Sequence, residues 1–292
     1  YTIMQAPLSR MALCLFVALP AQAQDFAREE LPGFRETPAY VLGSAQERWS
    51  GGNVNWYYNP AGQPTNLQTQ DVVNAIQTAA ARWAGMCNLT FTYMGTTSAV
   101  PNVRSTSGTI DQTNVVGWGL LTAEMAGYGA YTKWWYNGSH FLIDADVVIN
   151  TAYNWTLQNV ESIMTHELGH FIGLNHSNVQ ASVMFANPYN SYSYQRTLRG
   201  DDAEACAALY GASANAESNR AMNWAEQNFP SLLTPSPSAS GTAYGYYYRY
   251  YAGTNTYVGS KDGRAYLMGA DGVIRDQGAL ADYAATLRSA GF

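Results

Sequence analysis

Apolar side chains recur at three- and four-residue intervals between positions 70 and 86, which is the period of an amphipathic helix. They are Val72, Val73, Ile76, Ala80 and Trp83. We therefore expect a helix over 70–86 with this apolar face in the core. The alternation Leu-Thr-Phe-Thr-Tyr at 89–93 predicts a strand, and further strands are expected at 53–58, 127–132 and 141–150.

The second half of the chain alternates between helical and strand-like segments. We expect helices at 157–173 and 201–210, the second beginning well because carboxylates are favoured at a helix N-terminus. The small, polar stretch 212–219 indicates a boundary. Beyond it we expect a short helix at 221–227, a three-stranded meander and a final helix at 279–289. The meander strands are 246–251, 256–259 and 264–268.

Three of the four histidines fall in the eleven-residue stretch His166-Glu167-Leu168-Gly169-His170-Phe171-Ile172-Gly173-Leu174-Asn175-His176. Positions i and i+4 share one face of a helix, so His166 and His170 can bind the same ion. Gly173 can adopt the positive φ that ends a helix and brings His176 back as a third ligand. Three protein ligands leave one position of a tetrahedral zinc open, which is typical of a catalytic site. Glu167, beside the ion, can activate a bound water.

Composition and charge narrow the function classes. The chain has 292 residues, 22 tyrosines and a net charge of −6, and only 12% of its residues are charged. Without a block of basic residues, nucleic acid is not an expected partner. We expect no membrane span, and we expect a monomer.

Residues 1–23 have the features of a secretory signal. A basic residue, Arg10, precedes a short apolar run that ends at Ala21-Gln22-Ala23, a small-x-small cleavage pattern. The run is too short to cross a bilayer. Residues 24–45 follow as a linker or a short pro-segment. Export would leave Cys87 and Cys206, which suggest one disulfide, although two free thiols remain an alternative.

With Met184 in Ser182-Val183-Met184-Phe185 and a serine after the third histidine, the chain resembles the metzincin metalloproteases, and among them the matrixins. The likeness covers about 46–211, including the paired aspartates Asp201-Asp202. It implies an α+β fold: a twisted, mostly parallel sheet with an antiparallel edge strand and three helices. A small α+β module (220–292) would follow the linker 212–219. The resemblance also implies one catalytic zinc, a methionine turn at Met184, and substrate contacts that include an edge strand. The expected substrate-binding residues are Tyr128, Ala130, Pro188 and Tyr189.

The chain departs from animal matrixins in ways that resemble bacterial members. No Pro-Arg-Cys-Gly stretch precedes the domain, and His140 is the one histidine outside the motif. His140 is therefore expected to be a surface or strand residue rather than a ligand of a second zinc. Asp144 and Asp146 are either calcium ligands or turn and strand-edge carboxylates.

Taken together, these features predict a secreted zinc endopeptidase acting on extracellular proteins or peptides. The alternative is a surface adhesion protein in which the tyrosine-rich module binds a glycan or protein. The same tyrosines also fit the two faces of an ordinary sheet. A zinc hydrolase that is not a protease is a third hypothesis.

Overall fold

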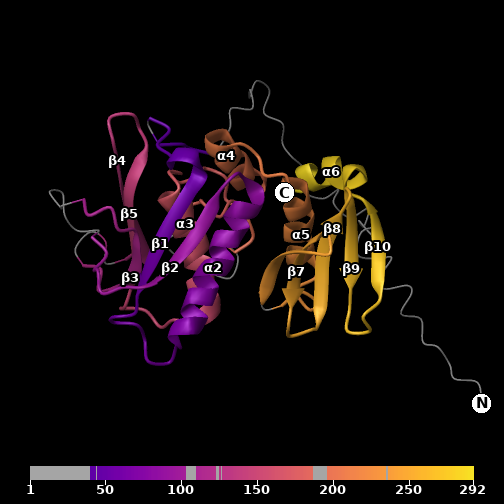
Figure 1. Ribbon diagram of the computed structural model, residues 1–292, viewed down its shortest axis with the longest axis horizontal. Coiled ribbons are helices and arrows are strands. Elements are labelled where there is room, and N and C mark those ends of the chain that lie inside the picture. The colour runs from indigo at the N-terminus through magenta and orange to yellow at the C-terminus, as the bar shows by residue number, and fades with distance from the viewer. Residues whose placement is uncertain are drawn as a thin grey trace, which may run out of the picture.

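The computed structural model describes residues 40–43, 45–102, 110–122, 125, 127–186, 196–234 and 236–292. The predicted signal sequence, most of the predicted linker at 24–45, and both Pro188 and Tyr189 lie outside these ranges. The described residues form two five-stranded sheets, each with its own helices (Figure 1). Both parts mix strands and helices, which confirms the α+β class. Within the described ranges, no helix is long and apolar enough to cross a membrane.

The first sheet is mostly parallel. It has the order β2-β1-β3-β5-β4, and only the outer strand β4 runs antiparallel to its neighbour β5. The strands are β1 (Asn53–Asn59), β2 (Thr90–Thr96), β3 (Val115–Gly119), β4 (Ala130–Tyr136) and β5 (Leu142–Asn150). An antiparallel edge strand agrees with the sequence prediction, but it spans Ala130–Tyr136 instead of the expected 127–132. The strand β3 was not predicted.

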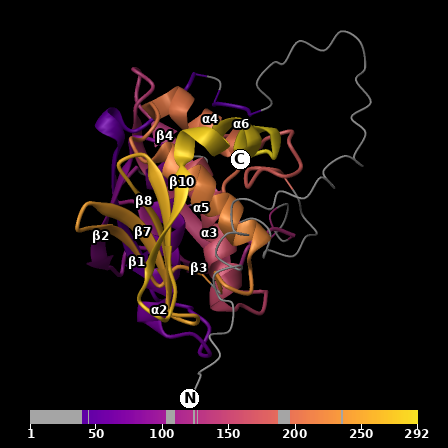
Figure 2. The same cartoon turned by 90° about the vertical axis from the view of Figure 1, so that its right-hand side faces the viewer.

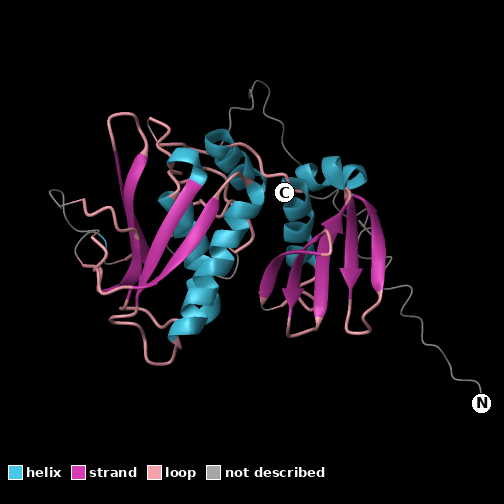
Figure 3. Cartoon of the chain, in the orientation of Figure 1, coloured by secondary structure: helices cyan, strands magenta, loops and turns pink. Residues whose placement is uncertain are grey.

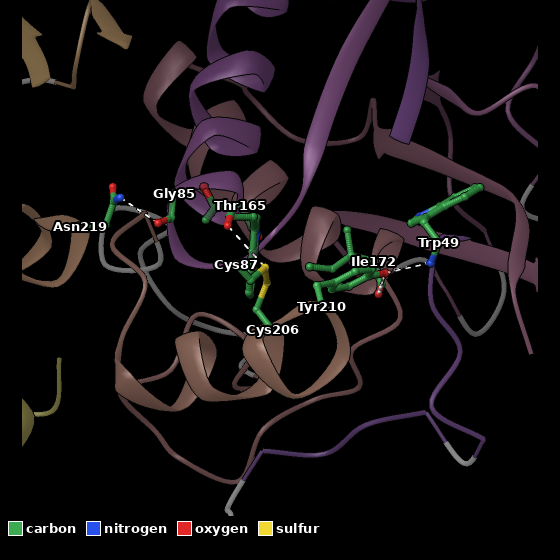
Figure 4. The surroundings of a disulfide bond; sticks show 9 residues. Trp49, Gly85, Cys87, Thr165, Ile172, Cys206, Tyr210 and Asn219 are labelled. Carbon is green, nitrogen blue, oxygen red and sulfur yellow. Dashed lines mark hydrogen bonds between the residues drawn. A yellow bond between two sulfur atoms is a disulfide. The ribbon is translucent and has the colours of Figure 1, made fainter. Parts of the chain in front are cut away.

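Two helices, α2 (Thr69–Met86) and α3 (Leu157–Phe171), pack together against one face of this sheet (Figures 1 and 3). The predicted apolar face of α2 is buried, and Trp83 donates its indole N–H to the carbonyl of Thr165 in α3 at 2.8 Å. A third helix, α4 (Gly200–Tyr210), and a short 3₁₀ turn, η1 (Ser50–Gly52), complete this part. A disulfide joins Cys87, directly after α2, to Cys206 in α4 (Figure 4).

The second sheet is antiparallel throughout and has the order β10-β9-β8-β7-β6. Its strands are β6 (Ala239–Ala243), β7 (Tyr246–Tyr251), β8 (Thr256–Lys261), β9 (Arg264–Met268) and β10 (Ile274–Ala279). The expected three-stranded meander is thus the centre of a larger sheet. Helices α5 (Ala216–Asn228) and α6 (Leu280–Ser289) lie on one side of it (Figure 2). Because α5 begins at Ala216, the second half of the predicted linker 212–219 is helical.

The tyrosine run on β7 divides between the two faces of this sheet. Tyr247 and Tyr251 bond to side chains of α5. The alternate residues point away from the helices and pair across strands, with ring centroids 4.3 Å apart for Tyr250–Tyr257 and 5.2 Å for Tyr246–Tyr266. Cross-strand aromatic pairs stabilise antiparallel sheets, so part of the tyrosine content has a structural role.

The two parts are joined by buried polar contacts between α2 and the C-terminal module. Asn219 of α5 donates to the carbonyl of Gly85 at 2.8 Å (Figure 4). A side chain at position 85 would overlap Asn219, since a Cβ there would lie 2.6 Å from its amide. Arg82 of α2 lies between two carboxylates, Glu161 of α3 and Glu226 of α5, at 2.8 Å from each. The module is therefore packed onto the helix layer of the first sheet.

Candidate metal centre and substrate cleft

The helix α3 presents the first two histidines of the motif on one face. It begins after Thr156, whose side chain accepts a hydrogen bond from the main-chain N–H of Asn159 at 3.2 Å, satisfying one free donor of the first turn. His166 and His170 lie in its last two turns, and their ring centroids are 4.8 Å apart.

The chain then turns sharply to return the third histidine. Gly173 has φ +96°, and a Cβ at this position would lie 2.1 Å from the carbonyl oxygen of Glu47. Glycine is therefore required for two reasons, the backbone conformation and the close approach of another segment. His176 is returned so that its Nε2 lies 3.2 Å from Nε2 of His170. All three side chains offer a ring nitrogen within 4.8 Å of the others.

Main-chain carbonyls fix which ring nitrogens are free. Nδ1 of His166 donates to the carbonyl of Val183 and Nδ1 of His170 to that of Leu174, each at 2.7 Å. Nε2 of each ring is then left with its lone pair. Burial lowers the pKa of His166 to about 4 and also lowers the pKa of His170 and of His176, so the rings are neutral near pH 7.

This donor set fits zinc. Two nitrogens bound to one tetrahedral zinc at about 2.1 Å are about 3.4 Å apart, close to the observed separation of the His170 and His176 nitrogens. Three neutral imidazoles leave a fourth position for water. His166, His170 and His176 are the residues that would hold the ion.

Glu167 lies next to the histidines but points to a different partner. Its side chain is buried, and its Oε2 accepts a hydrogen bond from Oγ1 of Thr132 on β4 at 2.5 Å. Burial raises the pKa of Glu167 to about 7, and the Thr132 hydrogen bond acts in the opposite direction. A cation on the histidines would favour the ionised form, which is the form a general base needs.

The methionine turn packs under the ligand helix. Met184 is buried, and a Cβ at Gly169 would lie 2.1 Å from its sulfur, so glycine between the two ligand histidines makes room for the methionine. The turn is held by Asp202 of α4, whose carboxylate accepts hydrogen bonds from Ser182 and from the main-chain N–H groups of Val183 and Met184.

The neighbouring Asp201 holds the segment that follows the third histidine. It accepts a hydrogen bond from Ser177, the residue after the third histidine, at 2.6 Å. Sequence reasoning placed both aspartates at the start of a helix. The sequence around the two aspartates did not indicate that Asp201 binds the segment after the third histidine or that Asp202 binds the methionine turn.

A cleft of about 690 Å³ opens beside the histidines. The outer strand and its approach form one wall, with Tyr128 and Ala130 both lining the cleft. Trp134, farther along β4, stacks on His170 with centroids 6.1 Å apart and planes 15° apart. This tryptophan was missed because nothing local in the sequence marks it as facing the histidines. Ile163 and Phe185 also line the cleft.

The segment before the first sheet also reaches this region. The main chain of Leu42 forms a bridge with Leu174, and Val41 accepts a hydrogen bond from the N–H of Asn175 at 2.9 Å. The end of the stretch predicted as linker or pro-segment therefore lies along the turn that carries the third ligand.

The remaining predicted residues are placed elsewhere. His140 is exposed in the turn between β4 and β5, away from the cluster. Asp144 and Asp146 lie buried on β5 and bind main-chain N–H groups of the segments around β3: Asp144 accepts from Asp111 and Gln112, and Asp146 from Asn102 and Val115. Burial raises the pKa of Asp146 to about 7.

Comparison with known proteins agrees with this geometry. Residues 48–211, more than half of the chain, match the model of the matrixin family, and the chain belongs to that family. It is 26% identical over 202 residues to an interstitial collagenase of Sus scrofa, covering 67% of this chain and 39% of the collagenase. It is also 26% identical over 204 residues to metalloendoproteinase 2-MMP of Arabidopsis thaliana, covering 65% of this chain and 49% of that protein.

Matrix metalloproteinase-18 of Xenopus laevis is 30% identical over 155 residues, covering 51% of this chain and 31% of that protein. The chain thus spans less than half the length of these three relatives. Membership of the family supports a zinc metalloendopeptidase.

Proposed function

We propose that this protein is an active zinc-dependent endopeptidase that is secreted and cleaves extracellular proteins or peptides. The observation that supports this most strongly is the convergence of three imidazole nitrogens and one buried carboxylate on a cleft walled by the edge of a sheet. Bound zinc would supply a Lewis acid that acidifies a water and polarises the scissile carbonyl.

The residues around the ion have separate roles in this proposal. A substrate lying extended in the cleft adds main-chain hydrogen bonds to the outer edge of β4, which pairs with no other strand in the part of the chain that the structure describes, beside Tyr128 and Ala130. Glu167 takes the proton of the attacking water and delivers it to the leaving amine. Pro188 and Tyr189 remain predicted parts of the pocket wall.

Replacing Glu167 by alanine tests the proposal. The variant keeps the three ligand histidines and is expected to bind zinc stoichiometrically, while hydrolysis of casein falls by about 10²–10⁴-fold because the general base is lost. Gln158→Ala, on the exposed start of the same helix, is the matched control and should keep both zinc and activity. Undiminished casein hydrolysis by Glu167→Ala, or a wild-type protein that binds zinc and cleaves nothing, would refute the assignment.

Secretion is proposed from the signal-like sequence at 1–23 together with the Cys87–Cys206 disulfide, because disulfides persist mainly in oxidising compartments. Because His140 is the one histidine outside the motif, the ligands of a second zinc found in animal matrixins are not present, which further favours the bacterial type of matrixin. A calcium ion at Asp144 stays a prediction; its support is that Oδ1 of Asp144 is buried with no hydrogen-bond partner among the described residues.

The adhesion hypothesis makes a different prediction for the module. The face of its sheet opposite the helices carries the paired tyrosines Tyr246–Tyr266 and Tyr250–Tyr257, and flat aromatic surfaces can stack on sugar rings. A glycan or protein ligand at this face remains a prediction. A Tyr250→Ala variant of the full chain that keeps proteolysis but loses retention on an immobilised polysaccharide would support it.

A further inference from the structure

A single side chain connects the edge strand of the cleft to the catalytic carboxylate. Thr132 lies in the first half of β4, and its side chain is buried against α3. Its hydroxyl lies 2.5 Å from Oε2 of Glu167 and 3.2 Å from the main-chain oxygen of the same residue. A hydroxyl has one proton to donate, and the shorter contact to a carboxylate identifies Oε2 as the acceptor.

This hydrogen bond restricts the carboxylate in a way that packing alone does not. The last torsion of a glutamate side chain has a broad energy minimum, so an unbonded carboxylate rotates over a wide range. A donor fixed to one oxygen sets the plane of the group. Because Thr132 belongs to a strand paired with β5, the donor itself is held by the sheet.

We propose that Thr132 is a positioning residue for the reaction: it holds Oε2 of Glu167 so that Oε1 meets the attacking water at a fixed distance from substrate bound on β4. This inference rests on the proposed peptidase function. The strand that aligns the peptide and the helix that carries the base are thereby kept in register by one hydrogen bond.

The proposal predicts a specific split in the kinetic constants. Substrate binding uses the main chain of β4, which a change of side chain at position 132 leaves in place. Loss of the hydroxyl is therefore expected to lower kcat by about ten- to a hundredfold, the effect of losing one hydrogen bond to a charged group. KM is expected to stay within about twofold.

Two substitutions separate positioning from packing. Thr132→Val keeps the shape of the side chain and removes the donor, and Thr132→Ser keeps the donor and removes a methyl group. We expect Thr132→Val to show the fall in kcat and Thr132→Ser to recover most of it. Zinc content should match wild type in both, and both should stay folded at the assay temperature; Thr132→Val is expected to melt lower than wild type because the buried carboxylate loses a donor. A kcat of Thr132→Val equal to wild type would overturn the proposal, as would an equal loss in the serine variant.

A binding measurement keeps this test independent of proteolysis. A small hydroxamic acid binds zinc as its anion through its two oxygens, and the neighbouring carboxylate can take up and share the proton that the hydroxyl gives up, so its affinity depends on the orientation of Glu167. We expect Thr132→Val to weaken hydroxamate binding in calorimetry, and to have no effect when Glu167 is already alanine. If the protein cleaves no peptide but Thr132→Val weakens hydroxamate binding only when Glu167 is present, the proposed function is contradicted while the role of Thr132 in holding Glu167 is supported. Equal affinities of wild type and Thr132→Val contradict that role whatever the activity.

Discussion

The buried charges between α2 and the C-terminal module provide a quantitative test of the fold. Glu226 accepts hydrogen bonds from Arg82 at 2.8 Å, from Arg249 at 2.7 Å and from the hydroxyl of Tyr251. Burial alone would raise the pKa of Glu226, but the charges of Arg82 and Arg249 outweigh it and lower the pKa from its ordinary 4.5 to about 2. Each pKa unit corresponds to about 1.4 kcal/mol, so this shift in pKa corresponds to about 3 kcal/mol of stabilisation of the ionised form.

We expect Glu226→Gln to lower the free energy of unfolding by about 3 kcal/mol at pH 7, in the lower part of the range for breaking a buried ion pair. Because the folded pKa lies below the unfolded one, the stabilisation is complete above about pH 4.5 and disappears as the pH falls toward about 2. The difference between wild type and variant should therefore shrink over this interval.

Urea unfolding, followed by tryptophan fluorescence at several pH values, measures both effects. Asp276→Asn is the control: it removes a carboxylate from the same module, but one whose ion pair with Arg264 is exposed. It should leave the midpoint nearly unchanged. A Glu226→Gln variant that loses less than about 1 kcal/mol at pH 7, or a difference that stays constant down to pH 2, would show that the network does not hold the two parts together.

Two further substitutions test the frame around the metal site. Replacing both Cys87 and Cys206 by alanine should cost about 2–5 kcal/mol, because the disulfide closes a loop of 119 residues in the unfolded chain; a reductant should destabilise wild type similarly and the double variant no further. Gly173→Ala should cost about 1–3 kcal/mol from its positive φ alone and weaken zinc binding, since the turn must move away from Glu47; Gly138→Ala, with open space around it, should do neither. Unchanged zinc affinity in Gly173→Ala would show that this turn does not place His176.

The elements that sequence predicted best are those whose signal is local. The ligand helix, its glycine turn and the apolar face of α2 each depend on spacing within about ten residues. The strand β3 was missed because its residues Val115–Gly119 are nearly all buried and show no alternation. The strand β6 was missed because its five residues, Ala239–Ala243, are small and polar or weakly apolar and give no strand pattern.

The unpredicted parts of the site come from contacts between distant segments. Thr132 and Glu167 are 35 positions apart, and Asp202 reaches the methionine turn from another helix. Arg82 sits among alanines on α2, where a charged residue predicts an exposed position. Its burial depends on Glu161 and Glu226, which no pattern around residue 82 reveals.

The position of Arg82 also offers a way to recognise related chains by sequence. A matrixin domain that ended near residue 211 would leave this guanidinium with one carboxylate and an uncovered helix face, so selection would favour a different residue there. Arginine at this position, glutamate five residues before the first ligand histidine, and a glutamate in the helix that follows the domain should therefore be inherited together. Genomes that encode all three are expected to encode the appended sheet as well.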